Sequence, residues 1–174
     1  MEVIMKRSIT LWQLTGFAVA ALGGTLLHFL YEWTGENRFA ALFSSVNEST
    51  WEHMKLLFFP MFIFALIQSR FFRDEERFFC IKLRGILLGL ALIPVIYYTY
   101  NGVIGKSPDW VNIAIFFIAA AIVYIYEAGM LKRDTVECGF PRLSLAVLCL
   151  IAVLFWVFTF VTPPLEIFRD PLAS

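Results

Sequence analysis

Long apolar segments recur along the chain, and they constrain its fold more than any other feature. A helix needs roughly 20 mostly apolar residues to cross about 30 Å of hydrocarbon. The chain contains five runs of about this length, at Leu11–Tyr31, Met54–Phe72, Ile86–Val103, Trp110–Leu131 and Leu143–Val161. Short charged clusters separate them. The sequence therefore predicts an all-α integral membrane bundle of about five transmembrane helices.

Composition supports this class and excludes others. Of the 174 residues, 60% are hydrophobic and 16% are charged, which is more apolar than a soluble domain of this size. The formal net charge is zero, so the chain gives no electrostatic reason to bind nucleic acid. We expect a single transmembrane domain over residues 1–174 whose main partners are membrane lipids. Its expected spans are 11–32, 52–72, 82–103, 110–131 and 143–162, with an outward loop at 33–51.

The distribution of Lys and Arg predicts the orientation, because cytoplasmic loops of membrane proteins carry an excess of these residues. Alternate loops divide the 14 basic residues unequally. One side receives ten of them, namely Lys6, Arg7, Arg70, Arg73, Arg77, Lys82, Arg84, Lys132, Arg133 and Arg142. The other side receives Arg38, Lys55, Lys106 and Arg169. We therefore expect the N-terminus in the cytoplasm and the C-terminus outside.

The three cysteines give no sign of a disulfide framework. With this orientation, Cys80 and Cys138 lie at the cytoplasmic face and Cys149 lies within the last span. Disulfides are rare in the reducing cytoplasm. A metal or redox pair formed by Cys80 and Cys138 is an alternative, but buried cysteines in apolar segments more often act as small packing residues.

Small residues form a ridge on the first span. Gly16, Ala20, Gly24, His28 and Glu32 follow one another at intervals of four. Small residues allow close helix packing in lipid, so this ridge should face the bundle interior. His28 and Glu32 would then point inward near the outer membrane surface. Small-residue faces of this kind, including Gly85 and Gly89 of the third span, also suit a homo-oligomer.

A second polar group follows the outward loop. Ser45 and Glu48 fit a capping box, which predicts that a helix begins there. On that helix Glu48, Glu52 and Lys55 would share one face. Two carboxylates on one face repel each other and need a cation. Lys55 is the simplest partner for Glu52, and a protonated His28 or a metal ion are the alternatives.

The metal hypothesis uses the imidazole and carboxylate groups of both helices, which are ligands that zinc, iron or manganese accept. The expected ligands are His28, Glu32, Glu48 and either Glu52 or His53, since neighbouring residues on a helix diverge. Glu52 and His53 are also the candidates for a catalytic role. No nucleotide or other organic cofactor is indicated.

Another charge lies inside an apolar run. Glu127 falls near the cytoplasmic end of the fourth span. A carboxylate at this depth usually has a cationic partner. We expect either an ion pair with one of the basic residues at the same level, Arg84, Lys132 or Arg133, or a side chain that snorkels to the membrane surface.

The segments LHFLYEWTGEN, VNESTWEHMKLLFFP and TPPLEIFRDP make the chain resemble an uncharacterised family of small bacterial multi-pass membrane proteins with a VNESxWEHxK motif. The resemblance covers nearly the whole chain. It implies a location in the bacterial cytoplasmic membrane but no activity. The residues that match the family pattern are His28, Asn47, Glu48, Trp51, Glu52, His53 and Lys55.

The sequence leaves several functions open. One is a metal-dependent membrane hydrolase acting on a lipid or lipid-linked substrate, in which a metal activates water and a carboxylate is the base. The second is a non-catalytic protein that binds or transports a cation or small ligand, and the third is a membrane scaffold. Whether the protein is an enzyme is therefore undecided. Asn47, Trp51 and Lys55 complete the predicted polar site beside its His and Glu residues.

Overall fold

The computed structural model describes residues 2–72, 76–133 and 137–171. This part of the chain is helical and contains no β-strand, which confirms the predicted all-α class. Five helices are long and apolar enough to cross a membrane. They are α1 (Glu2–Trp33), α3 (Thr50–Gln68), α4 (Phe78–Val103), α5 (Asp109–Leu131) and α6 (Pro141–Phe160). A short helix, α2 (Arg38–Ala41), and a 3₁₀ turn, η1 (Glu166–Phe168), lie outside this set.

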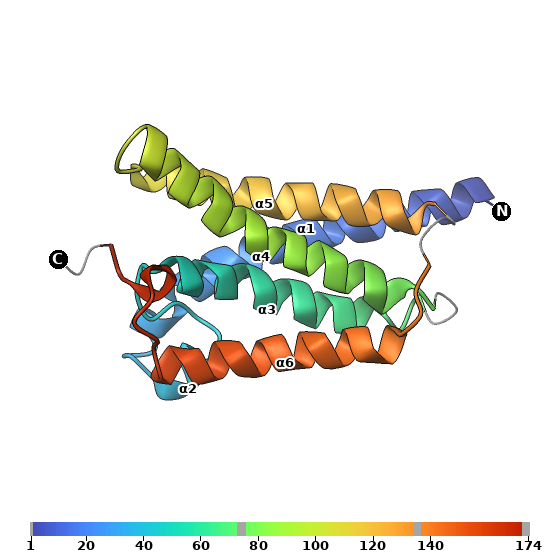
Figure 1. Cartoon of the computed structure of the whole chain (residues 1–174). Coiled ribbons are helices and arrows are strands. Elements are labelled where there is room, and N and C mark those ends of the chain that lie inside the picture. Colours follow the sequence, from blue (N-terminus) through green and yellow to red (C-terminus); the bar gives the residue numbers. More distant parts are fainter. Residues whose placement is uncertain (1, 73–75, 134–136, 172–174) are drawn as a thin grey trace.

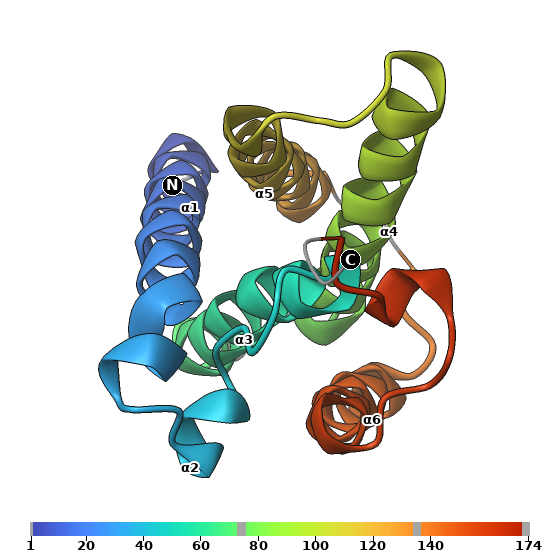
Figure 2. The same cartoon turned by 90° about the vertical axis from the view of Figure 1, so that its left-hand side faces the viewer.

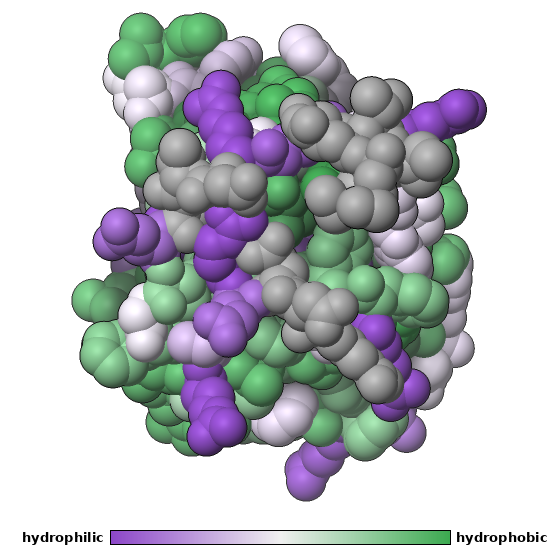
Figure 3. Space-filling view, turned by 90° about the vertical axis from the view of Figure 1, so that its right-hand side faces the viewer, coloured by the Kyte–Doolittle hydropathy of each residue, from purple (hydrophilic) through white to green (hydrophobic). Residues whose placement is uncertain are grey.

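The central helix of the bundle is α3. Figure 2 shows α3 with α1, α5, α4 and α6 arranged around it, and Figure 1 shows the long helices side by side. Most residues of α3 are buried, whereas the other four long helices expose apolar side chains on their outer faces. Examples are Leu22, Val95, Ile125 and Leu150, each more than half exposed. Such faces suit a hydrocarbon environment. Figure 3 shows hydrophilic side chains gathered at the end that holds the N-terminus.

The glycine ridge of α1 packs into the bundle as predicted. A Cβ atom on Gly16 would lie 2.5 Å from the Tyr124 ring, and one on Gly24 would overlap the Phe116 ring and approach the backbone of α3. Only glycine allows α1 to approach α3 and α5 this closely. Each step of four residues rotates about 40° around a helix. The ridge therefore turns away from the interior, and Glu32 is exposed.

The start of α3 differs from the prediction. Its N-cap is Ser49, whose Oγ accepts a hydrogen bond from the Glu52 backbone N–H at 3.4 Å. Both Ser45 with Glu48 and Ser49 with Glu52 have the spacing of a capping box, so the pattern alone does not choose between them. Ser45 is instead bound to His28. The segment before α3 is consequently an irregular loop that carries Glu48.

Glu127 pairs with a different cation from those predicted. Lys82 Nζ lies 2.5 Å from Glu127 Oε2, and both side chains are buried. Lys82 was counted as a loop residue because it stands beside charged sequence, but it lies in the second turn of α4. Gly85, one turn further on, leaves the space that the Glu127 carboxylate occupies.

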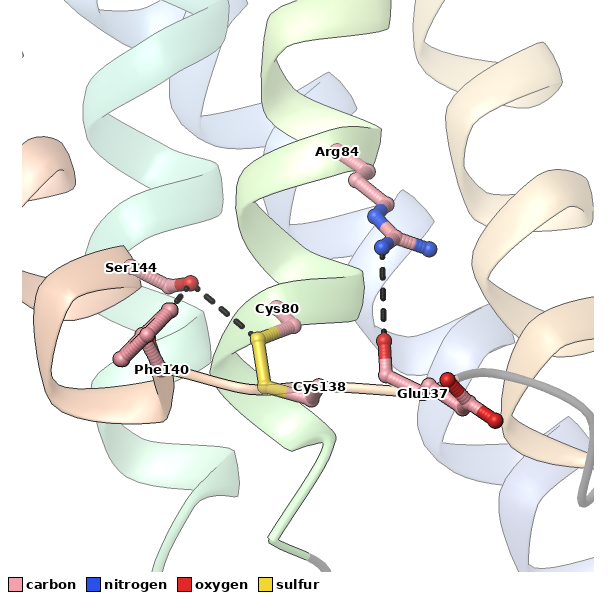
Figure 4. The surroundings of a disulfide bond; sticks show 6 residues. All are labelled: Cys80, Arg84, Glu137, Cys138, Phe140 and Ser144. Carbon is pink, nitrogen blue, oxygen red and sulfur yellow. Dashed lines mark hydrogen bonds between the residues drawn. A yellow bond between two sulfur atoms is a disulfide. The ribbon is translucent and has the colours of Figure 1, made fainter.

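The expectation that no disulfide forms is also wrong for this structure. Cys80 is bonded to Cys138, with a Cα–Cα distance of 6.0 Å. Figure 4 shows that the bond joins the first turns of α4 to the segment before α6. Ser144 Oγ lies 3.2 Å from Cys80 Sγ, and Arg84 donates to the Glu137 carbonyl at 3.4 Å. The two cysteines are 58 residues apart in sequence, and the pair that forms is the one named above as the alternative.

The disulfide can be tested by the reactivity of the cysteine thiols in cells. In a Cys149→Ser background, which removes the cysteine of α6, N-ethylmaleimide added to intact cells should leave the bonded pair unmodified. Denaturation, reduction with dithiothreitol and labelling with a maleimide-coupled polyethylene glycol should then add two labels per chain, visible as a gel shift. The double variant Cys80→Ser/Cys138→Ser in the same background is the control and should take none. Absence of the shift in the Cys149→Ser protein would show that the thiols are free in the cell.

Candidate functional site

Three predicted residues meet at the end of the bundle opposite the N-terminus. His28 lies in the last third of α1, Glu48 in the loop before α3, and His53 in the first turn of α3. Nε2 of His28 is 3.8 Å from Glu48 Oε1, and Nε2 of His53 is 3.5 Å from Glu48 Oε2. One ligand atom from each residue lies within 4.8 Å of the others. All three residues are half-buried.

Hydrogen bonds orient both imidazole rings. His53 Nδ1 lies 3.0 Å from the Ser49 carbonyl, which can only accept, so Nδ1 carries the proton. Ser45 donates its hydroxyl proton to the His28 carbonyl at 3.3 Å, and therefore accepts from His28 Nδ1 at 3.1 Å. In the neutral rings, both Nε2 atoms are then unprotonated, and each lies within 3.8 Å of an oxygen of Glu48. The arrangement presents two imidazole nitrogens and one carboxylate to a shared space.

Glu52 does not join this cluster. Its Oε2 lies 2.5 Å from Lys55 Nζ and accepts from the Val46 N–H at 3.1 Å. Lys55 also donates to the Ala41 carbonyl at 2.8 Å and to Thr159 Oγ1 at 3.0 Å. The predicted pairing of Glu52 with Lys55 is thus confirmed, but the pair is buried rather than interfacial. Its contacts hold the loop against α3 and α6.

The other predicted polar residues also have structural roles. Asn47 Oδ1 accepts from the Ser49 N–H at 2.9 Å and shapes the turn before α3. Trp51 packs between α6 and η1, with its ring tilted against those of Phe155 and Phe168 at centroid distances of 4.6 and 4.7 Å. Glu32 is exposed and stands outside the cluster. Of the expected ligands, the structure brings together His28, Glu48 and His53.

Two cavities meet at this cluster. The larger, of about 320 Å³, is lined by Glu48 and His53 and by residues near the α4–α5 loop. The smaller, of about 180 Å³, is lined by both histidines and by side chains of α1, α3 and α5. His53, Asn112 and Phe116 line both cavities. The cluster is therefore accessible to a ligand from two directions.

Sequence reasoning did not single out the polar wall of the larger cavity. Ser107 is buried, and its hydroxyl donates a hydrogen bond to Asn112 Oδ1 at 2.8 Å. The same hydroxyl oxygen accepts a hydrogen bond from Asn101 Nδ2 at 3.3 Å. The Ser107 N–H donates to Asn101 Oδ1 at 2.8 Å. Asn101 and Asn112 stand near the ends of apolar runs, where asparagine is a common turn residue. The feature of the sequence that could have indicated this wall is Asn112, a polar residue inside the start of an apolar run.

Comparisons with known proteins identify a family but no activity. No curated protein and no solved structure matches the chain. The sequence model of a family of unknown function, DUF6512, matches residues 1–174. This match agrees with the predicted resemblance to an uncharacterised family. The chain therefore belongs to the DUF6512 family.

Proposed function

We propose that this multi-pass membrane protein binds a divalent metal ion through His28, Glu48 and His53 and uses it to activate water for hydrolysis. The observation that carries the proposal is the convergence of two oriented imidazole nitrogens on one carboxylate. Metal-binding histidines usually donate their other ring N–H to a carbonyl or similar acceptor. Ser49 and Ser45 occupy these positions here.

The distances fit a metal better than direct hydrogen bonds. A hydrogen bond between nitrogen and oxygen spans about 2.7–3.2 Å. The Nε2–oxygen distances of 3.5 and 3.8 Å are longer. Metal–ligand bonds of about 2.0–2.1 Å in tetrahedral geometry separate two ligand atoms by roughly 3.3 Å. The three ligand atoms lie within 4.8 Å of one another, so the side chains would have to close around an ion to reach that separation.

The ligand number supports a catalytic site over a structural one. Structural zinc sites usually have four protein ligands, whereas catalytic sites have three and keep a position for water or substrate. Two histidines and one glutamate form such a set, and the adjoining cavities give access to the open position. A bound metal lowers the pKa of its water and supplies a nucleophile near neutral pH. Zinc, iron and manganese are the metals that suit these ligands.

Metal content tests this proposal. Protein purified in detergent, incubated with zinc, iron or manganese and then desalted, should retain about one metal ion per chain by mass spectrometry. Glu48→Gln and His53→Ala should each reduce retention at least tenfold, since each removes one of three ligands. Glu32→Gln, which removes an exposed carboxylate near the site, is the matched control and should retain the wild-type amount.

Two results would count against the proposal. Equal metal content in wild type and Glu48→Gln would show that the ion binds elsewhere. If the protein retains metal but hydrolyses no lipid ester or phosphoester, the result would support a non-catalytic cation-binding function and contradict the proposed hydrolase activity. Circular dichroism of each variant checks that the helices remain folded.

We further propose that the site faces the outside of a bacterial cytoplasmic membrane, with the N-terminus in the cytoplasm. The excess of Lys and Arg at the N-terminal end supports this orientation. The Cys80–Cys138 disulfide at the same end is instead typical of an oxidising compartment. The two observations oppose each other, so the orientation needs a direct test.

Labelling in intact cells provides that test. In a Cys149→Ser background, Glu36→Cys should react with a membrane-impermeant maleimide, because Glu36 is exposed in the loop after α1. Lys132→Cys, exposed at the opposite end, should react only after lysis. The reverse pattern would place the N-terminus and the disulfide outside.

A further inference from the structure

The smaller cavity has an apolar lining at the side of the bundle. Its walls come from α1, α3 and α5, including Gly24, Phe29, Leu56, Ile113 and Phe117. Phe29 and Ile113 are 42% and 58% exposed, so they stand at the outer surface between α1 and α5. In a bilayer that surface faces hydrocarbon. An apolar chain could therefore pass from the membrane into the cavity without crossing water.

Most of the lining of the larger cavity is apolar, but it carries more polar groups than the lining of the smaller one. The larger cavity is lined by polar residues from the end of α4, the loop after it and the start of α5, namely Tyr97, Tyr98, Asn101, Lys106 and Asp109. These residues offer hydrogen-bond donors and acceptors together with charges of both signs. They lie at the end of the bundle, where the chain leaves its apolar helices. The larger cavity thus offers more polar groups to the head of a lipid than the smaller one does.

Asn112 lies where the cavities meet. Its Oδ1 is held by the Ser107 hydroxyl, which fixes the direction of the amide. Within the described residues, the amide nitrogen of Asn112 makes no hydrogen bond. It is therefore a donor available at the junction, beside His53, which lines both cavities as well. A ligand oxygen at this point would lie near both the amide and the metal ligands.

We infer that the substrate of the proposed metal site is an amphipathic lipid. Its acyl or prenyl chain enters between α1 and α5, and its oxygen-rich head occupies the larger cavity. This inference rests on the proposed function for the reaction, and on the two cavities for the substrate class. The volume of about 180 Å³ is below the 300–1,000 Å³ of ordinary ligand pockets, so only the head-proximal part of the chain fits inside. The remainder stays in the bilayer.

Photocrosslinking can detect a chain in the cavity. The protein is placed in phosphatidylglycerol vesicles that contain a phosphatidylglycerol with a diazirine on its acyl chain. Crosslinks are then mapped by mass spectrometry. Leu56 and Phe116 are 3% and 9% exposed, so bulk lipid does not reach them. Crosslinks at these two residues are expected in the wild-type protein, beside the crosslinks that any lipid-facing residue gives.

Filling the cavity should remove the buried crosslinks. Ile113→Trp narrows the apolar cavity from α5, and Thr25→Trp narrows it from α1. Each should reduce crosslinking at Leu56 and Phe116 at least fivefold. Ile118→Trp, on the exposed face of α5 and outside the cavity, is the matched control and should leave it unchanged. Equal crosslinking in all four proteins, or none at the buried residues in the wild type, would overturn the inference.

The same samples separate this inference from the proposed function. Metal content is measured on every protein, and the cavity variants should keep it because no metal ligand is changed. If the wild-type protein retains metal but gives no crosslinks at Leu56 and Phe116, the metal site is supported and the lipid substrate is rejected. If it gives these crosslinks but retains no metal, lipid binding is supported and the metal-dependent reaction is rejected.

Discussion

Replacing Lys55 by methionine should destabilise the bundle by about 3–5 kcal/mol, because it leaves the Glu52 carboxylate buried without its cation. Both side chains are almost fully enclosed, at 0% and 3% exposure. Lys55 also loses its hydrogen bonds to the Ala41 carbonyl and to Thr159. The substitution therefore removes a charge partner and leaves a carbonyl and a hydroxyl with one donor fewer. Few single changes in this chain combine these costs.

Equilibrium unfolding in mixed detergent and sodium dodecyl sulfate, followed by circular dichroism, measures the loss. Lys132→Met removes an exposed lysine and should change the free energy of unfolding by less than about 0.5 kcal/mol. The double variant Lys55→Met/Glu52→Gln should recover part of the loss, since Gln keeps an acceptor for the Val46 N–H. A Lys55→Met protein as stable as Lys132→Met would show that the pair contributes little.

This pair also determines how the candidate site is held. Glu52 binds the loop at Val46, and Lys55 binds the end of α2 at Ala41, so the two contacts lie on the two sides of Ser45. Ser45 in turn orients His28, and Glu48 lies on the same loop. Lys55→Met should consequently weaken metal retention without removing a ligand. Much of the VNESxWEHxK motif therefore supports the loop instead of contacting a ligand.

The helices could be predicted because each depends on a local property of the sequence. An apolar run of sufficient length is a helix candidate wherever it lies, and all five were found. The start of α3 was misplaced because two overlapping serine–glutamate pairs fit the same cap. Which one caps the helix depends on His28, 17 residues earlier, since that residue engages Ser45. Local pattern could not supply this contact.

The candidate site was predictable to the extent that helix geometry is regular. The small-residue ridge correctly directed His28 towards the start of α3, where Glu48 lies 3.8 Å away. It failed for Glu32, because the ridge rotates and α1 extends beyond its packed part. The contacts of Cys80 with Cys138 and of Lys82 with Glu127 join segments 58 and 45 residues apart. Only the packing of α4 against its neighbours determines these pairs.

Lys82→Met is the second substitution with a large expected effect. It leaves the Glu127 carboxylate, which is fully buried, without its cation between the second turn of α4 and the last turns of α5. Breaking a buried pair in this way costs about 3–5 kcal/mol in proteins generally. The ammonium group also lies 5.5 Å from the ring centroids of Phe78 and Tyr124, and these cation–π contacts are lost as well. The same detergent titration measures the change.

The double variant Lys82→Met/Glu127→Met should behave differently from its counterpart at Lys55. Glu127 Oε1 has no hydrogen-bond partner among the described residues, so the present pair already includes an unsatisfied buried atom. Removing both charges abolishes that cost, and linear apolar side chains of similar length can fill the space beside Gly85. Replacing a buried pair by apolar residues is often neutral or stabilising by about 1–4 kcal/mol. We therefore expect the double variant to be at least as stable as the wild type, whereas the Lys55 double variant stays below it because its pair also holds Ala41 and Thr159. A Lys82 double variant as unstable as Lys82→Met alone would mean that the charges themselves, and not the mere filling of space, hold α4 against α5.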